Sequence, residues 1–388
     1  MIQYFDNFYG GQINLADIGY SGIPVDDRVE PDARLTTVFE EARAIAEVMD
    51  GFGYDTLWLA EHHFQREGYG CIPNIPMLAV YLSQITDRLN FGSMFNIVPA
   101  WHPLRLAEDY ALADVLTKGR FRFGIGRGYI AREVETLGSP LDDDQANRDL
   151  FEEQVEILFK AWNESSFSHR GKYYDLPARI RHRGRDLNDI TLVPRPVTHP
   201  VRCWQPIVSV NPRGIAFMVK HGISGVVPGG SRVYEIARKW QEALSVAGRE
   251  TDQGTDLAVV VQIHLADTRE QALQEATVWY EEQVKVLAPL GMMSSLTPAQ
   301  VEATRDPVKA PLAGLPTVRD LERDGSWLCG PPELLIEKIE AMQEKLPGLS
   351  RLVVGAGGLG IPPDVIRQDL EWFGREVLPK FSRANQVV

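Results

Sequence analysis

The chain has 388 residues, 44% hydrophobic and 24% charged, which is enough apolar sequence for a large folded core. Its formal net charge of −13 argues against nucleic acid or an anionic membrane surface as a partner. No run of about 18 apolar residues occurs, and the N-terminal residues lack the basic flank and cleavage site of a signal peptide. We therefore expect neither a membrane span nor secretion.

The cysteines are few and widely separated. Cys71, Cys203 and Cys329 follow neither a zinc-ligand spacing nor a disulfide framework. We expect reduced thiols in a cytoplasmic protein.

Strand-like and helix-like segments alternate through the first half of the chain. Apolar residues recur at helical spacing over 35–49, whereas 55–61 is apolar on both faces, as in a covered parallel strand. The first expected elements are strands at 2–10, 55–61, 89–98 and 121–126 and helices at 35–49, 77–86 and 102–119.

The second half repeats this alternation. It is expected to hold strands at 206–210, 224–227, 257–265 and 351–358 and helices at 147–163, 213–221, 232–247, 268–287, 332–345 and 363–378. Eight strands, each followed by at least one helix, predict an α/β fold of the (β/α)8 barrel type in a single domain spanning 1–388.

Two segments interrupt the repeat. Residues 165–200 are rich in arginine and proline, and 289–326 carry five prolines with little periodicity. The second segment lies between the seventh and eighth strands, and loops that follow barrel strands form the mouth of the site. We therefore interpret 289–326 as a candidate lid, with a passive surface insertion as the alternative.

A pair of histidines ends the second expected strand in the stretch Glu61-His62-His63-Phe64. Neighbouring strand residues point to opposite faces, so the two rings are poorly placed to share a metal, and no metal site is expected. One imidazole at the barrel mouth can act as a general base near neutral pH. A hydrogen-bonded structural histidine is the alternative.

Glycines at 124, 126 and 128 follow the fourth expected strand but do not spell the dinucleotide-binding pattern. They allow backbone to approach a ligand, and Arg127 between them can bind a phosphate or a carboxylate, or pair with a surface acid. Ser209 and Asn211 precede an expected helix and suit either phosphate binding or helix capping.

Several motifs together resemble the bacterial luciferase-like family of flavin-dependent monooxygenases. They are "GYDTLWLAEHHF", "AWHPLRLAEDYALADVLTKGRFRFGIGRG", "FSHRGKYYDLP" and, near the C-terminus, "LCGPPELLIEKIEAM" and "LVVGAGGLG". The similarity covers most of the chain in the same order and is weakest at 178–200 and 289–326.

This resemblance implies a barrel, usually a homodimer, that uses reduced FMN supplied by a separate flavin reductase, with O2 as co-substrate. It implies an acid/base role beside the flavin for His62 and a contact between Arg127 and the FMN phosphate. It also implies a non-prolyl cis peptide beneath the flavin at Met94–Phe95. The full set of implied cofactor contacts is Met94, Phe95, Gly126, Arg127, Gly128, Ser209 and Asn211.

The resemblance has one departure. The luciferase α chain carries a reactive cysteine where this chain has Gly126, which weakens a light-emitting interpretation but leaves the monooxygenase interpretation intact. Aromatic residues near strand ends, Phe8, Phe64 and Trp101, suit an apolar substrate pocket, although core packing is the alternative.

The expected function is a two-component FMN-dependent monooxygenase acting on a small, apolar organic substrate. Two alternatives stay open at this point: a deazaflavin-dependent dehydrogenase or reductase on the same fold, and a non-catalytic flavin-binding protein.

Overall fold

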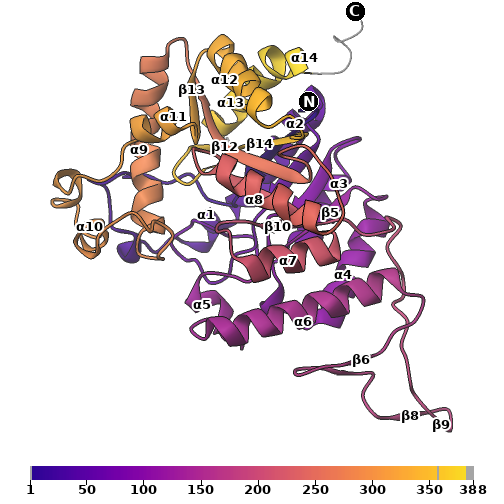
Figure 1. Ribbon diagram of the computed structural model, residues 1–388. Coiled ribbons are helices and arrows are strands. Elements are labelled where there is room, and N and C mark those ends of the chain that lie inside the picture. Colours follow the sequence, from indigo (N-terminus) through magenta and orange to yellow (C-terminus); the bar gives the residue numbers. More distant parts are fainter. Residues whose placement is uncertain (1, 356–357, 382–388) are drawn as a thin grey trace, which may run out of the picture.

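Parallel strands close into a barrel in the computed structural model, which describes residues 2–355 and 358–381 (Figure 1). The pairing runs β1-β2-β3-β5-β10-β11-β12-β14 and back to β1. These eight strands are β1 (Tyr4–Tyr9), β2 (Thr56–Leu59), β3 (Asn90–Ser93), β5 (Phe121–Gly126), β10 (Cys203–Pro206), β11 (Ser224–Pro228), β12 (Leu257–Leu265) and β14 (Arg351–Gly355). The (β/α)8 barrel predicted from the alternation is confirmed.

Amphipathic helices surround the barrel. In α2 the buried residues Val38, Ala42, Ile45 and Met49 recur on one face, and Gly53 ends the helix with a φ of 81°. The other long helices are α3 (Ile75–Ser83), α4 (Pro103–Leu116), α6 (Asp144–Asn163), α7 (Pro212–His221), α8 (Val233–Val246), α9 (Arg269–Leu287), α12 (Pro332–Lys345) and α13 (Pro363–Glu376); α2 itself spans Thr37–Phe52.

The strands differ from the sequence expectation in several places. The strand expected at 89–98 is divided into β3 and β4 (Asn96–Ile97), and residues 356–357 of the strand expected at 351–358 lie outside the described residues. The fifth barrel strand, β10, lies at Cys203–Pro206 and not at 206–210, because the chain beyond Ile207 leaves the sheet and becomes exposed. A short strand, β13 (Trp327–Gly330), was not predicted. It pairs with β12 over Gln262–Leu265, just beyond the stretch Leu257–Val260 that pairs with β11.

The two interrupting segments have some regular structure. The 289–326 insertion contains α10 (Pro298–Ala303) and α11 (Val318–Asp324), and each helix starts with a capping box. Residues 165–200 carry two short hairpins, β6–β7 (His169–Arg170 with Asp175–Leu176) and β8–β9 (Arg181–His182 with Arg185–Asp186). These hairpins extend away from the barrel in Figure 1.

The barrel interior is filled in layers. At the N-terminal end, Nη1 of Arg351 lies 2.6 Å from Oδ1 of Asp6 and 2.8 Å from Oδ2 of Asp55. An apolar layer lies inside the barrel, with Phe8, Phe95 and Val260 packed against it; its buried members are Trp58, Met94, Trp204, Val226, Ala258 and Val353. The packed interior means that the barrel is not a pore, and barrel enzymes place their active sites at the C-terminal mouth.

Two further features concern membrane-spanning helices and the state of the cysteines. None of the helices in the described residues is both long enough and apolar enough to cross a bilayer. All three cysteines are free, with Cys203 and Cys329 buried and Cys71 half-buried.

Candidate active site

A cavity of about 500 Å³ opens at the C-terminal ends of the barrel strands. It brings together Phe8 from β1, His62 from beyond β2, and Gln262 from β12, which are far apart in sequence. Its lining also includes Met94, Phe95, Gly126, Arg127, Gly128, Ser209 and Asn211, so every cofactor contact implied by the resemblance lies on this one cavity.

The wall formed by β3 and β5 depends on close backbone packing. The Met94–Phe95 peptide bond is cis, as the resemblance implied. Neighbouring β5 carries glycine where a side chain would collide: a Cβ at Gly124 would lie 2.0 Å from the carbonyl oxygen of Ser93. A Cβ at Gly126 would lie 3.2 Å from Cβ of Phe95. Glycine therefore lets β5 approach the cavity wall at Phe95.

His62 is held at the cavity by one of its two ring nitrogens. Nδ1 lies 3.1 Å from Oε1 of Glu133, whose carboxylate also accepts from Nε2 of Gln65 and from the backbone N–H of His63. Burial opposes ionisation of Glu133, but the contact with His62 and the other donors outweigh it and lower the pKa of this carboxyl. Nε2 of Gln65 also lies 3.0 Å from Nδ1, but it donates to Oε1 of Glu133 at 2.6 Å. Because an ionised carboxylate only accepts, we assign the proton to Nδ1, which leaves Nε2 as an acceptor.

His63 is engaged elsewhere. Its Nε2 lies 2.9 Å from Oε1 of Glu61, a buried carboxylate that also accepts from Nε1 of Trp101 and the backbone N–H of Ile97. Burial lowers the pKa of His63, but the hydrogen bond with Glu61 reverses this and raises it overall. The two adjacent rings thus contact two different glutamates, which agrees with the expectation that they diverge.

Two guanidinium groups lie at one end of the cavity. Arg127 donates to Asp144 (2.8 Å) and to Asn147 (3.1 Å), so it both lines the cavity and pairs with an exposed acid. Arg148 lines the same end, and burial together with the nearby charge of Arg127 lowers its pKa. Two adjacent half-buried cations are suited to binding an anionic group.

The start of α7 borders this cationic end. Asn211 caps the helix, its side-chain oxygen accepting from the N–H of Gly214 at 3.1 Å. Ser209 is exposed in the preceding loop. The structure therefore supports the capping alternative for Asn211, while both residues stay at the cavity rim.

Two glutamines at strand ends were missed by the sequence reasoning. Oε1 of Gln205, on β10, and Oε1 of Gln262, on β12, are buried and have no hydrogen-bond partner among the described residues. A buried amide oxygen without a donor is costly, so these two positions suit a ligand with N–H or O–H groups. Their location near the ends of strands was the one sequence feature that could have identified them. The roles of Glu61, Glu133 and Arg148 were also missed.

Two of the three expected substrate aromatics lie away from the cavity. Phe8 lines it, but Phe64 is 53% exposed in a turn with a φ of 61°. Trp101 packs against the core with its indole N–H on Glu61 at 2.7 Å. The expectation of a substrate contact at Phe64 and Trp101 is therefore not supported by their positions.

Comparison with known proteins adds family membership. Residues 22–347 match the family model described as luciferase-like monooxygenase. The chain belongs to the luciferase-like monooxygenase family. Its similarity to 4-hydroxyprotoasukamycin monooxygenase of Streptomyces nodosus subsp. asukaensis is 28% identity, covering 87% of this chain and 85% of that protein. Because its homologues are monooxygenases, this protein is assigned to the oxidoreductases.

Solved structures of this luciferase-like fold use more than one cofactor. The oxygenating constituent of 3,6-diketocamphane monooxygenase from Pseudomonas putida, in complex with FMN, superposes with a TM-score of 0.71 at 22% identity, covering 98% of this chain and 99% of that one. The coenzyme F420 dependent tetrahydromethanopterin reductase of Methanopyrus kandleri gives 0.66 at 16% identity, with coverages of 98% and 100%. These likenesses establish the fold. Within the described residues, no group of three or more His, Cys, Asp or Glu side chains is arranged for a metal.

Proposed function

We propose that the protein is an FMN-dependent monooxygenase that uses reduced FMN and O2 to oxygenate a small, mostly apolar organic substrate. One observation carries this proposal. A single cavity is lined by the oriented imidazole of His62, by two neighbouring guanidinium groups, and by two glutamine side-chain oxygens that have no hydrogen-bond donor among the described residues. Family membership supports it independently.

The residues of the cavity fit an FMN molecule. Arg127 and Arg148 would hold its phosphate, with Ser209 beside them at the rim. The ring system would rest against Phe8 and the Met94–Phe95 peptide. The free oxygens of Gln205 and Gln262 would accept from the N–H groups at the polar edge of the ring, which removes their unmet hydrogen-bonding capacity.

The bound reduced flavin supplies the electrons for oxygen activation. His62 Nε2 holds or accepts a proton at the cavity, because Glu133 fixes the Nδ1–H tautomer. Met292 from the 289–326 insertion reaches the same cavity, which supports the role of this segment as a lid that excludes water. The reduced flavin comes from a separate flavin reductase, and the protein acts as a cytoplasmic homodimer.

Binding and oxygenation together test this proposal. Reduced FMN is titrated anaerobically into the protein, and turnover is then followed with ¹⁸O2 and a panel of apolar alkenes, ketones and phenols by mass spectrometry. We expect FMN binding and incorporation of one labelled oxygen atom per product molecule. Failure to bind FMN, together with hydride transfer from reduced deazaflavin cofactor, would instead establish the dehydrogenase alternative. FMN binding without any turnover would establish the flavin-binding protein.

Substitutions at the cationic end of the cavity test where the FMN phosphate binds. Arg148→Ala should weaken FMN binding roughly ten- to hundredfold, because a charged hydrogen bond contributes about 1.5–3 kcal/mol. Arg213→Ala is the matched control: Arg213 lies next to this end but pairs with Asp149 and Glu152 outside the cavity lining. Riboflavin, which lacks the phosphate, should bind both variants and the wild type equally.

A further inference from the structure

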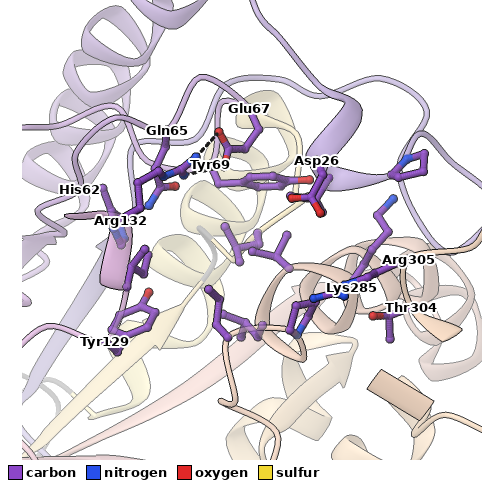
Figure 2. Close-up of a pocket in the computed structure, with 18 of the residues that line it drawn as sticks. Asp26, His62, Gln65, Glu67, Tyr69, Tyr129, Arg132, Lys285, Thr304 and Arg305 are labelled. Atoms are coloured by element: carbon purple, nitrogen blue, oxygen red, sulfur yellow. Dashed lines mark hydrogen bonds and ion pairs between the residues drawn. The ribbon is translucent and has the colours of Figure 1, made fainter. Parts of the chain in front are cut away.

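A second cavity, of about 490 Å³, lies at the barrel mouth beside the first (Figure 2). Its walls come from the loop after β1 at 24–27, the loop after β2 at 62–69, the segment 129–132 and the end of α9 with the start of the insertion at 285–290. Arg305 and Thr304 from the insertion face it across from Glu67 and Tyr69 in Figure 2.

The two cavities meet at His62 and Tyr129, which line both. Each volume falls in the range that holds one drug-sized ligand, about 300–1,000 Å³. FMN of the proposed function would occupy the first cavity, whereas the adjoining one would stay open. The adjoining cavity is therefore the place for the substrate, an argument that rests on the proposed function.

The lining of the second cavity indicates an uncharged ligand. Its charged groups are already satisfied or solvated: Arg132 pairs with Glu67 at 2.6 Å, and Lys285 with Glu282 at 2.8 Å. Lys285 also donates to two backbone carbonyls, so all three of its protons are used. Asp26, Asp27 and Arg305 also line the cavity but are exposed to solvent. The apolar part of the wall consists mainly of Val25, Ile130, Val286, Leu287, Leu290 and Leu359. Placing an unpaired charge against such a wall would be costly.

The imidazole at the junction adds one polar requirement. Nδ1 of His62 contacts Glu133 and Gln65, and none of the described residues hydrogen-bonds Nε2. With the proton on Nδ1, Nε2 is an acceptor and recognises a ligand that donates. A hydroxyl group is the neutral donor that meets this requirement.

We propose that the second cavity binds the substrate as a neutral, mostly apolar molecule whose hydroxyl group donates to His62 Nε2 at the junction with the flavin cavity. Leu290 and Leu359, from two separate segments of the wall, limit the size of the apolar body.

A pair of matched probes tests this assignment. Binding of 4-butylphenol and of its methyl ether, 4-butylanisole, is measured by calorimetry on FMN-loaded protein. The phenol should bind roughly three- to tenfold more tightly than the ether, the range expected for one net hydrogen bond. His62→Ala should abolish this preference while leaving the ether's affinity nearly unchanged.

Wall substitutions locate the probe. Leu290→Trp should weaken both probes at least tenfold and leave FMN affinity unchanged, since Leu290 does not line the first cavity. Leu359→Phe is a second variant with the same expectation, and Leu312→Trp, at an exposed insertion residue, is the control. Thermal unfolding checks that each variant folds.

The outcomes separate the two proposals. Equal affinity for phenol and ether in the wild type, or probe binding that Leu290→Trp and Leu359→Phe leave unchanged, overturns the substrate assignment even if FMN binds normally. Displacement of the probe by FMN overturns it too, because the probe would then occupy the cofactor cavity. If FMN does not bind but the probe pattern holds on the unloaded protein, the flavin proposal fails and the hydroxyl-binding cavity stands.

Discussion

At the scale of single residues, the hydrogen bonds around His62 determine what its imidazole can do. Glu133 comes from α5 (Ala131–Val134), and the chain brings it to the ring across 71 positions. The carboxylate leaves Nε2 as the acceptor, so the protonation chemistry of His62 depends on a residue that touches neither cavity's contents directly. Glu133 is therefore a positioning residue.

Replacement of this carboxylate should impair turnover without impairing cofactor binding. In Glu133→Gln the amide can donate to Nδ1, so the opposite tautomer becomes available and Nε2 no longer acts uniformly as an acceptor. We expect kcat to fall roughly ten- to hundredfold, with FMN affinity unchanged and the acidic limb of the pH–rate profile displaced. Glu135→Gln, at an exposed position on the same segment, should behave as the wild type. An unchanged kcat in Glu133→Gln would remove Glu133 from the mechanism.

Site residues could be predicted from the sequence only where a local pattern, such as the end of an apolar strand, marks their position. His62 and Arg127 stand at the ends of apolar strands, so barrel geometry alone places them at the mouth. Glu133 and Arg148 lie in helices, and nothing in their local pattern indicates which side faces the cavity. Gln205 was hidden because the fifth strand was expected too late in the chain, which put the strand end at 209–211.

At the scale of elements, a buried histidine ties the seventh strand to two helices. His264 on β12 has Nδ1 at 3.0 Å from Asp369 on α13 and Nε2 at 2.8 Å from Glu275 on α9. Burial lowers its pKa, but the two carboxylates outweigh this and raise it above the usual value. The charged imidazolium thus bridges two helices across the strand.

This bridge predicts a pH-dependent contribution to stability. Because the folded-state pKa of His264 is raised, its contribution is fully present below the unfolded pKa of about 6.5 and is lost as pH rises through the folded value. The Tm difference between wild type and His264→Gln should be larger at pH 6 than at pH 9 in thermal unfolding. The contrasting control is His221→Gln. Burial lowers the pKa of His221, so its contribution should decline toward acidic pH. Equal differences for His264→Gln at both pH values would contradict the bridge.

Regular elements were otherwise predictable, and the exceptions have physical causes. Long helices such as α2 and α9 repeat apolar residues over several turns, so their periods survive in the sequence. The four-residue β13 is too short to show a period, and it forms where β12 extends past its pairing with β11 and offers free backbone groups. The helices of the insertion are likewise too short to show a repeat, and of their two capping boxes only Thr297–Gln300 follows the usual sequence pattern.

At the scale of the whole molecule, α3 and α4 pack against each other and present an apolar outer face. Its exposed members are Met77, Tyr81, Leu112 and Leu116. Arg105 and Glu108, a pair of opposite charges on α4, flank it. A surface with exposed apolar residues and both signs of charge suits contact with a second copy of the same surface.

The expected homodimer should therefore depend on this face. Met77→Glu combined with Leu112→Glu should convert a dimer to a monomer in light scattering, because each substitution puts a charge into the contact twice. Leu312→Glu, at a position 84% exposed in the insertion, should leave the mass unchanged. A dimer that survives the double substitution would place the interface elsewhere, and a monomeric wild type would contradict the homodimer.

The two cavities overlap at only two lining residues, His62 and Tyr129. Changes at 24–27 or 285–290 alter one chamber and leave the lining of the other untouched. Selection can thus vary the molecule that is accepted while the chemistry beside it is conserved, and one barrel can diversify into many specificities. Among close homologues, the walls at 285–290 should diverge faster than the wall at 126–128.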